Sequence, residues 1–368
     1  MRIGLLATSY PRFDGDPAGG FVAGHVDALR AQGHDVDVLA AGDGHGRIAG
    51  GRLFYTGGAP DLLATRSPRA LADATAFTAR LYAAAAWRCR KWDAVVAHWL
   101  APCGVVAAAL PTRAPLLAIA HGGDVHTLRD AGLLAAALHA LARRRAHLAF
   151  VSAALRDVAV EAAPRLAGWL ADAAIQPMGL DLPRFAAIPR APASPPIVLV
   201  VARLVAVKGV DVAIDALALA RRRLGAHLVV AGDGPDRDKL AARARANDLH
   251  ATFVGEVTTR RRDELLATAS VVAVPSRRLA NGRTEGMPTI ALEALAAGVP
   301  VVASRVGGLA ALPAPPVHLV APEDPLALAR GLETALQAPP TAAALRACVA
   351  HLDWPAVATA LAPSLRIA

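Results

Sequence analysis

Short runs of aliphatic, often β-branched residues alternate with longer Ala- and Leu-rich segments along almost the whole chain. In the first half of the chain the runs predict strands at 3–7, 36–40, 94–98, 116–120 and 148–151. Residues 20–32 predict a helix that ends just before Gly33. Because the runs are apolar at successive positions rather than at alternate ones, they suit parallel sheets covered by helices on both faces. The pattern therefore predicts an α/β fold built from doubly wound, Rossmann-like sheets.

A proline-rich stretch interrupts this pattern near the middle of the chain, at Pro183, Pro189, Pro192, Pro195 and Pro196. Proline continues neither a helix nor a central strand, so residues 183–196 are predicted to form a linker. Strands are then predicted at 197–201, 227–231, 252–254, 271–274 and 299–303, with helices at 211–223, 237–247, 260–269 and 288–297. The 368 residues are thus predicted to form two domains, 1–182 and 197–350, with a closing segment at 351–368. Ligands of such sheets bind at the carboxyl ends of the strands, so we expect the site in the cleft between the domains.

Residues 283–293 (RTEGMPTIALE) carry the densest group of candidate binding residues. Pro288 suits the first turn of a helix, where its missing N–H group costs nothing. The N–H groups of Gly286, Met287 and Thr289 would then be exposed at the positive end of the helix dipole. Such a helix start is a natural cradle for a phosphate group.

Glu285 and Glu293 flank this helix start and are eight residues apart, which is about 12 Å along a helix axis. That spacing is close to the distance from a sugar, across a diphosphate, to a nucleoside ribose, and a carboxylate at each end accepts hydrogen bonds from hydroxyl groups. In the alternative interpretation, Glu285 merely complements the helix dipole and Glu293 is an incidental buried residue. These residues alone leave both interpretations open.

Arg203 and Lys208 favour the first interpretation. They follow the predicted strand 197–201, five residues apart, in the loop that leads to the next helix. Two cations so placed converge on one diphosphate, with the guanidinium contacting two oxygens and the ammonium acting as a point charge. Lys208 is also one of only three lysines in a chain of 39 basic residues, which argues against an incidental solvated lysine.

With these residues the sequence resembles the retaining glycosyltransferases of family 4, which have the two-domain GT-B fold. The signature-like element is Glu285-x7-Glu293, and further motifs occur along the chain in the order typical of the family. These are VARL…KG at 201–209, VAGDGP at 230–235, FVG at 253–255, VPS at 274–276, AGVPVVA at 297–303, SYP…GG at 9–20, AHW at 97–99, AHGGDV at 120–125 and PMGLD at 177–181. The similarity covers nearly the whole chain, is most specific from 197 to 308, and is looser between 42 and 91, where the acceptor is expected to bind.

This resemblance implies a role for each candidate residue. Arg203 and Lys208 would neutralise the diphosphate of a UDP- or GDP-sugar, and Glu285 and Glu293 would hold the donor sugar and the ribose. His121 would lie close to the donor sugar and the reacting centre. Backbone groups of the remaining donor-binding residues would assist: Gly19, Gly20, Gly286, Met287, Pro288 and Thr289. The residues implied on the acceptor side are His98, Trp99 and Asp124.

The implied reaction moves the sugar to a glycan, lipid-linked or small-molecule acceptor with retention of configuration, in bacterial envelope or exopolysaccharide synthesis. The leaving phosphate would take the acceptor's proton, so no general base, cofactor or metal is expected. Three Asp-x-Asp pairs, at 14–16, 35–37 and 236–238, superficially match metal-binding motifs of other glycosyltransferases. Their predicted positions in a glycine loop, at a strand start and at a helix start argue against metal binding. His25 and His34 are interpreted as residues at a helix surface and a helix end.

Charge and composition limit the partners and the compartment. The formal net charge of +9 is spread evenly, which suits an anionic ligand or membrane surface, and the high arginine and alanine content does not indicate nucleic-acid binding. Three cysteines without C-x-x-C spacing favour a reducing, cytoplasmic compartment. The segment 83–92, with Trp87 and Trp92, could contact the inner face of a membrane, whereas 133–145 is better explained as a buried helix. The segment 351–368 resembles the family's last helix, which returns toward the first domain, and a short tail would brace domain closure less well.

Two other functions remain open. A nucleotide-sugar epimerase would share the architecture, although no cluster of acid and base carboxylates is evident. A non-catalytic nucleotide-sugar-binding subunit is the other alternative, and the presence of Arg203, Lys208, Glu285 and Glu293 counts against it.

Overall fold

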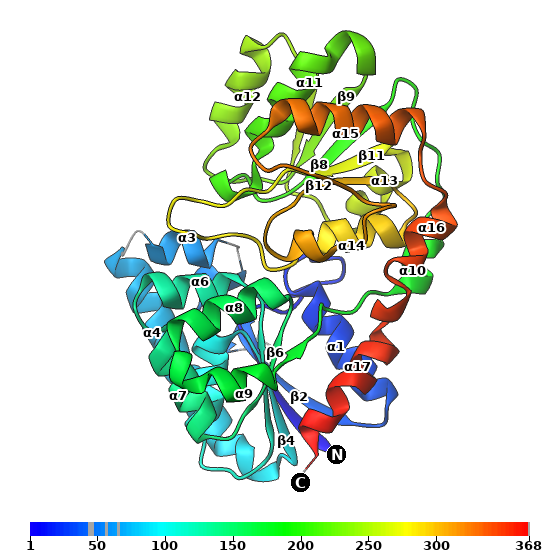
Figure 1. The fold of residues 1–368 in the computed structure, drawn as a ribbon. Coiled ribbons are helices and arrows are strands. Elements are labelled where there is room, and N and C mark those ends of the chain that lie inside the picture. Colours follow the sequence, from blue (N-terminus) through cyan, green and yellow to red (C-terminus); the bar gives the residue numbers. More distant parts are fainter. Residues whose placement is uncertain (43–47, 56–57, 65–66, 367–368) are drawn as a thin grey trace. The chain divides into compact units, whose positions relative to one another are not determined.

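In the computed structural model, described at residues 1–42, 48–55, 58–64 and 67–366, the chain folds as two compact units. The first comprises Met1–Gly179 with Trp354–Ala368, and the second comprises Leu180–Asp353. Each contains a parallel sheet with helices on both faces (Figure 1). The predicted doubly wound α/β fold class is therefore confirmed.

The first unit has a seven-stranded sheet in the order β3-β2-β1-β4-β5-β6-β7. Its strands are β1 (Arg2–Ala7), β2 (Asp35–Gly42), β3 (Ile48–Ala49), β4 (Ala94–His98), β5 (Leu116–Ala120), β6 (His147–Phe150) and β7 (Ala174–Ile175). Its helices are α1 (Gly20–Ala31), α2 (Arg52–Tyr55), α3 (Ala59–Ala64), α4 (Pro68–Arg88), α5 (Val105–Ala108), α6 (Gly123–Asp130), α7 (Leu134–Arg143), α8 (Ala153–Ala162), α9 (Ala167–Ala171) and α17 (Trp354–Leu361). The central strands are buried on both faces, which explains their continuous apolar runs.

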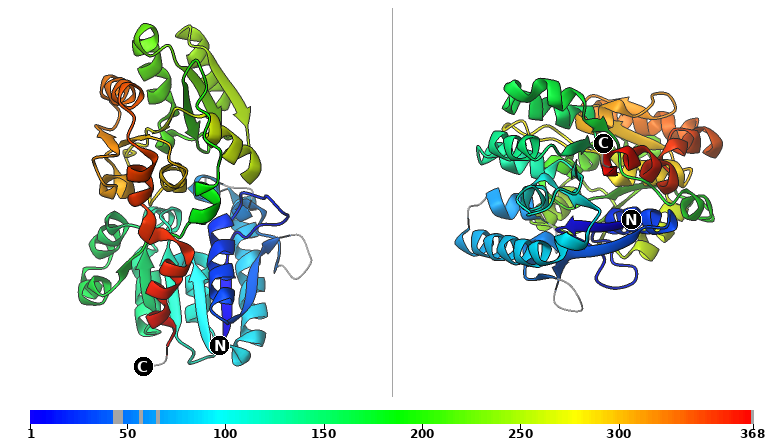
Figure 2. Two further views of the ribbon diagram at one scale, coloured as in Figure 1. Left: turned by 90° about the vertical axis from the view of Figure 1, so that its right-hand side faces the viewer. Right: turned by 90° about the horizontal axis from the view of Figure 1, so that it is seen from below.

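Helix α17 lies against α1, although the two are at opposite ends of the chain (Figures 1 and 2). Trp354 makes this packing specific, since side-chain carbons at Gly24 of α1 or at Gly179 would overlap its indole ring. Glycine is thus required at both positions by close approach rather than by backbone conformation.

The second unit has a six-stranded sheet in the order β10-β9-β8-β11-β12-β13. Its strands are β8 (Ile197–Val201), β9 (His227–Ala231), β10 (Ala251–Gly255), β11 (Val271–Val274), β12 (Val301–Ser304) and β13 (His318–Val320). Its helices are α10 (Leu182–Ala186), α11 (Val210–Leu224), α12 (Arg237–Ala246), α13 (Thr259–Thr268), α14 (Thr289–Ala296), α15 (Pro325–Gln337) and α16 (Ala342–Ala347). Helices α11, α12 and α15 pack together over one face of the sheet, and α14 packs with α10 and α16 (Figure 1).

In each unit the strand order reverses direction next to the first strand of the sheet, between β1 and β4 and between β8 and β11. Loops that leave two such strands diverge to opposite faces, which opens a crevice at their carboxyl ends. The candidate residues that follow β8 and β4 are therefore placed at the positions where doubly wound sheets bind ligands.

Two predictions about prolines need correction. The predicted linker 183–196 begins inside helix α10, because Pro183 occupies the first turn, where no N–H group is needed. Asp181 caps this helix by accepting a hydrogen bond from the N–H of Arg184. Pro288 precedes α14 as its N-cap residue, with φ −62° and ψ 117°, instead of lying within the first turn. The other predicted strand and helix boundaries agree with the structure to within one or two residues.

Candidate functional site

The loop after β8 holds Arg203 and Lys208. Lys208 ends a 3₁₀ turn, Ala206–Lys208, which is followed by Gly209 in the left-handed conformation (φ 63°) at the start of α11. A side-chain carbon on Gly209 would overlap the carbonyl oxygen of Pro275, in the loop after β11. The two loops at the strand-order reversal are therefore in direct backbone contact. This contact fixes the backbone position from which the Lys208 side chain extends.

Arg203 is positioned by the loop after β9. The N–H of Leu204 donates a hydrogen bond of 2.9 Å to the carbonyl oxygen of Asp233. Side-chain carbons on Gly232 and Gly234 would overlap the carbonyl oxygens of Ala202 and Leu204, respectively. The glycines of the GDG motif thus allow the β9 loop to pack against the backbone on either side of Arg203, which is half-buried.

Lys208 and Glu285 are brought together by the fold. Lys208 Nζ lies 2.8 Å from Glu285 Oε1, and their side chains are 25% and 12% exposed. The main chain of Glu285 is held in turn by the N–H of Gly308, which donates a hydrogen bond of 3.2 Å to its carbonyl oxygen. The pair is partly shielded from water but still reachable, so its ammonium can meet an anionic ligand while its carboxylate accepts from a hydroxyl group.

The predicted phosphate cradle lies directly after Glu285. Gly286 and Pro288 are buried, Met287 and Thr289 are half-buried, and α14 begins at Thr289. The N-cap residue, Pro288, makes no side-chain hydrogen bond to this helix start. The first N–H groups of α14 have no acceptor within the helix, which is the arrangement that suits an anion.

Glu293 lies in the middle of α14 and is 7% exposed. Its Oε1 atom pairs with Arg262 of α13 at 3.2 Å, while its Oε2 atom is buried and has no hydrogen-bond partner in the described part of the chain. Burial raises the pKa of the Glu293 carboxyl, and the nearby cations Arg262 and Arg184 oppose that shift. Sequence analysis did not identify Arg262, because nothing in the pattern of α13 connects it with α14.

In the first unit, Asp16 organises the loop between β1 and α1. Its carboxylate pairs with Arg12 at 2.6 Å and accepts N–H groups of Arg12 and Ala18 at 3.0 Å each. Gly19, with φ 69°, packs against the backbone of Ser9, where a side chain would not fit, and Gly20 begins α1 in an exposed position. Asp16 therefore shapes the predicted glycine loop.

His121 follows β5 and packs against two aromatic rings. The ring centroids of Phe21 and Trp99 each lie 4.9 Å from that of His121. Trp99 has φ 71°, an uncommon conformation for a bulky residue that marks local backbone strain. The backbone in this conformation places the indole beside His121.

His121 is also the last member of a histidine chain, His25–His98–His121. His98 Nδ1 lies 3.0 Å from His121 Nε2, and His25 Nδ1 lies 3.1 Å from His98 Nε2. Burial lowers the pKa of His25 to about 4 and that of His121 to about 3, and it lowers the pKa of His98 as well. The three rings are therefore neutral near pH 7.

The placement of His25 corrects the interpretation of this residue as a helix-surface histidine. Its side chain is fully buried, because it shares the apolar stripe of α1 with Val22, Val26 and Leu29. That spacing was the signal by which the sequence could have identified it.

The implied acceptor-side residues differ in accessibility. His98 is fully buried behind His121, and Asp124 is 6% exposed. Asp124 accepts the N–H groups of Leu100, His121 and Gly122 at 2.7, 3.1 and 2.9 Å. Burial raises the pKa of Asp124, and these hydrogen bonds oppose the shift. Neither residue is exposed for contact with an acceptor: Asp124 ties the loop after β4 to the loop after β5, and only Trp99 remains partly accessible.

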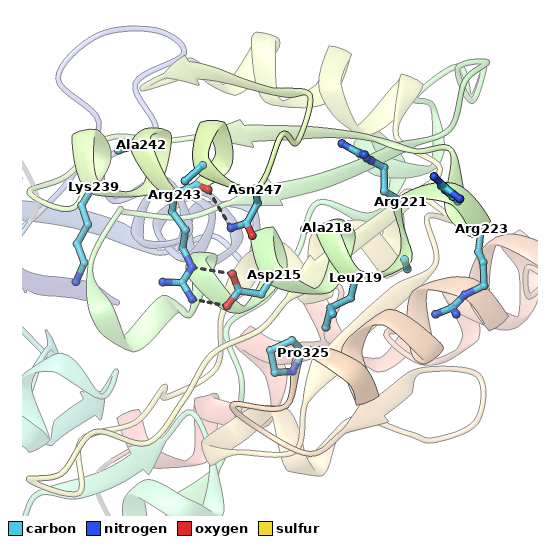
Figure 3. Close-up of a pocket in the computed structure, with 13 residues that line it drawn as sticks. Asp215, Ala218, Leu219, Arg221, Arg223, Lys239, Ala242, Arg243, Asn247 and Pro325 are labelled. Carbon is cyan, nitrogen blue, oxygen red and sulfur yellow. Dashed lines mark hydrogen bonds and ion pairs between the residues drawn. The ribbon is translucent and has the colours of Figure 1, made fainter.

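A separate hollow of about 1280 Å³ lies in the second unit between α11, α12 and the start of α15 (Figure 3). Its cations are largely paired with carboxylates, as in the contacts of Arg243 with Asp215 at 2.5 Å and of Arg221 with Asp248 at 2.5 Å. It contains none of the sequence-predicted site residues. We therefore do not regard it as the functional site.

The described residues contain neither a cluster of metal ligands nor a membrane-spanning helix. In these residues no group of three or more His, Cys, Asp or Glu side chains is arranged to hold a metal ion. Asp37, from one of the Asp-x-Asp pairs, is bonded to Arg88 at 2.8 Å and to Trp92 Nε1 at 3.1 Å. Within the same described ranges, no helix combines the length and apolar character needed to cross a bilayer.

Two family models match the chain, one in each of the two units. Residues 183–348 match the family model described as glycosyl transferases group 1, and residues 19–165 match the model described as glycosyltransferase family 4. A glycogen synthase of Mycobacterium tuberculosis is 33% identical over 293 residues, which cover 74% of this chain and 69% of the relative. A GDP-mannose-dependent alpha-(1-6)-phosphatidylinositol monomannoside mannosyltransferase of the same species is 40% identical over 147 residues, covering 36% of this chain and 38% of the relative.

Among solved structures, Anabaena Alr3699/HepE in complex with UDP and glucose superimposes with a TM-score of 0.72. The match covers 99% of both chains at 18% sequence identity, a level at which the likeness concerns the fold alone.

Proposed function

Because this chain belongs to glycosyltransferase family 4 and has the GT-B fold, we propose that it is a retaining enzyme that moves a sugar from a UDP- or GDP-sugar to an acceptor. The observation that carries the proposal is the ion pair of Lys208 and Glu285, which lies at the carboxyl end of β8, where doubly wound sheets bind ligands.

We attribute donor binding by the second unit to its positive charge. Lys208 and Arg203 neutralise the diphosphate, and the first N–H groups of α14 add partial positive charge. Glu285 accepts hydrogen bonds from sugar hydroxyl groups. The Oε2 atom of Glu293, which has no partner among the described residues, accepts from the ribose. We assign His121 to the donor sugar on the family resemblance, with backbone assistance from Gly19 and Gly20.

In the proposed reaction, the bond between the anomeric carbon and the donor phosphate oxygen breaks, and the acceptor oxygen bonds to the same face of that carbon. The acceptor's proton passes to the leaving phosphate oxygen, so no side-chain base is required. Lys208 and Arg203 stabilise the negative charge that develops on the diphosphate, which is where electrostatic catalysis has its largest effect. The same two cations replace a divalent metal, and the proposed enzyme is independent of metals and cofactors.

The acceptor is proposed to be a glycan, lipid-linked or small-molecule hydroxyl compound, and the process to be bacterial envelope or exopolysaccharide synthesis in the cytoplasm. The name of the mannosyltransferase relative supports a lipid-linked acceptor, since it contains phosphatidylinositol monomannoside. A putative teichuronic acid biosynthesis glycosyltransferase of Bacillus subtilis, 28% identical over 253 residues, supports a role in polysaccharide synthesis by its name. Of the acceptor-side residues only Trp99 is partly exposed, so we retain it alone as a candidate contact.

The decisive experiment measures nucleoside diphosphate release from a panel of UDP- and GDP-sugars, with and without an extract of acceptors, in the presence of EDTA. We expect one donor to raise the melting temperature and to be consumed in an acceptor-dependent manner. Conversion of the donor to its epimer would indicate an epimerase. Binding of a donor without any turnover would instead identify a binding subunit, and loss of activity in EDTA would contradict independence from metals.

We also propose that the end of α4 contacts an anionic membrane surface. Trp87 is 78% exposed and lies beside the exposed residues Arg90 and Lys91, whereas Trp92 is buried and excluded from this role. An exposed indole next to cations suits the headgroup region of an anionic bilayer. We expect the protein to sediment with vesicles of anionic lipid and the Trp87→Ala variant to remain largely in the supernatant, with Tyr82→Ala on the same helix as the control. Equal sedimentation of all three proteins, or of none, would exclude this contact.

A further inference from the structure

In the histidine chain His25–His98–His121, His25 and His98 are fully buried, His121 is half-buried, and both links are hydrogen bonds. A neutral imidazole has one N–H donor and one bare acceptor nitrogen. The two links, at 3.1 and 3.0 Å, therefore make the protonation of the three rings interdependent. If one ring carries its proton on Nδ1, the other two must do the same, and only two arrangements are possible.

The two arrangements differ at the inner end of the chain. The Nε2 atom of His25 is buried and has no hydrogen-bond partner in the described part of the chain. There His25 stacks on Trp354, with ring centroids 5.7 Å apart and an interplanar angle of 8°. Its Nε2 atom lies in the plane of the ring, so it cannot direct a proton at the indole face. In one arrangement this atom is a bare nitrogen, and in the other it is an N–H group without an acceptor.

A buried N–H group without an acceptor is rarer in proteins than a buried acceptor without a donor. The arrangement with every proton on Nδ1 is therefore favoured. His25 then donates to His98, and His98 donates to Nε2 of His121. The lack of a described hydrogen-bond partner at His25 Nε2 also argues against proton conduction along the chain, because a proton that reached this atom would have no acceptor to move to.

We propose that His25 and His98 are positioning residues that hold His121 in its Nδ1–H tautomer, so that His121 presents a hydrogen-bond donor to its ligand. Phe21 and Trp99 pack against the His121 ring and restrict its rotation, so the donor has a fixed direction. The identity of the ligand as a sugar nucleotide rests on the proposed function, whereas the tautomer does not. A donor at this position binds a hydroxyl or phosphate oxygen and cannot remove the acceptor's proton.

The tautomer is measured directly in the ligand-free, full-length protein labelled with ¹⁵N-histidine. Two-bond ¹H–¹⁵N correlation spectra distinguish a protonated ring nitrogen from a bare one, and single substitutions assign the three rings. We expect Nδ1 to be protonated in His25, His98 and His121 near pH 7. Protonation of His121 on Nε2 would overturn the proposal.

A matched pair of variants at His98 tests the consequence for activity. In His98→Asn, the side-chain amide nitrogen takes the place of Nδ1 and still donates a hydrogen bond to His121. In His98→Gln, the side-chain amide group takes the place of Nε2, so only the contact with His25 is retained. We expect His98→Asn to keep the His121 tautomer and to stay within a few-fold of the parent kcat. His98→Gln is expected to release the tautomer and to lose about tenfold in kcat, as for one hydrogen bond.

Melting temperatures of both variants verify that they fold. Equal losses of kcat in folded His98→Asn and His98→Gln, with the His121 tautomer unchanged in both, would show that His98 only fills space. If the spectra show the expected tautomer but no sugar nucleotide is bound or consumed, the proposed function fails and the tautomer assignment stands.

Discussion

Replacing Lys208 with methionine is expected to lower kcat/KM for sugar transfer by about 10²- to 10³-fold, the usual effect of removing one group that stabilises transition-state charge. Methionine has a similar length and no charge, so the change removes the ammonium that lies 2.8 Å from Glu285 and that we assign to the diphosphate. Most of the loss should appear in kcat, because charge on the leaving diphosphate is greatest in the transition state. Steady-state kinetics with a saturating acceptor measure the effect.

The chain itself offers the control, because Lys239 is one of its two other lysines. Lys239 lies on α12, where it lines the hollow between α11 and α12, and it has no role in the proposed site (Figure 3). Lys239→Met is expected to retain full activity. If both variants lost activity equally, or if neither did, Lys208 would have no specific role. The substitution also leaves Glu285 without its cation, which can destabilise the fold. A melting temperature of Lys208→Met close to that of the parent protein would exclude unfolding as the cause of the lost activity.

Replacing Gly209 with alanine is expected to destabilise the second unit and to abolish most of the activity. Gly209 has φ 63°, which costs an alanine roughly 1–2 kcal/mol. In addition, the new methyl group would overlap the carbonyl oxygen of Pro275, and forced displacement of packed groups costs typically about 1–3 kcal/mol. Relief of this overlap moves the loop after β8 and Lys208 with it. Urea unfolding and kcat/KM measure the two effects.

A control at Gly225 separates the conformational cost from the cost of the overlap with Pro275. Gly225 lies at the other end of the same helix, α11, in the same left-handed conformation (φ 53°). An added side-chain carbon on Gly225 meets no atom within 4 Å. Gly225→Ala is therefore expected to show only the conformational cost and to keep its activity. If Gly209→Ala and Gly225→Ala were equally stable and equally active, the contact with Pro275 would not position Lys208.

The central strands of both sheets were predicted closely because each is buried on both faces and needs a continuous apolar run. The short strands β3, β7 and β13 were not predicted, because two or three residues do not form such a run. The 203–208 loop was also identified correctly as following β8, since the end of an apolar run marks the end of a strand. Pro183 and Pro288 were harder to place, because a proline tolerated at a helix start and one that precedes the helix leave the same mark in the sequence.

The pairing of residues from different elements was less predictable. Glu293 was identified from its spacing to Glu285, but its partner Arg262 lies on another helix, 31 positions earlier (293 − 262), and no sequence period links the two. His25 was misinterpreted although its position among Val22, Val26 and Leu29 marks the buried face of α1. Burying a histidine on an apolar stripe costs less when a ring nitrogen finds a hydrogen-bond partner, and for His25 that partner is His98, at the end of β4.

The sequence by itself therefore determined the two parallel sheets, the order of their strands and helices, and the chemical types of the residues in the loops, since these follow from short-range apolar periodicity and turn chemistry. Only the tertiary structure decided which charges meet, as for Lys208 with Glu285, and which rings form a chain, as for the three histidines. The reason is physical: a pairwise contact depends on distances of about 3 Å between atoms whose elements are far apart in the chain. Hydrophobic patterning specifies where an element packs, but not which individual side chains of two elements come into register.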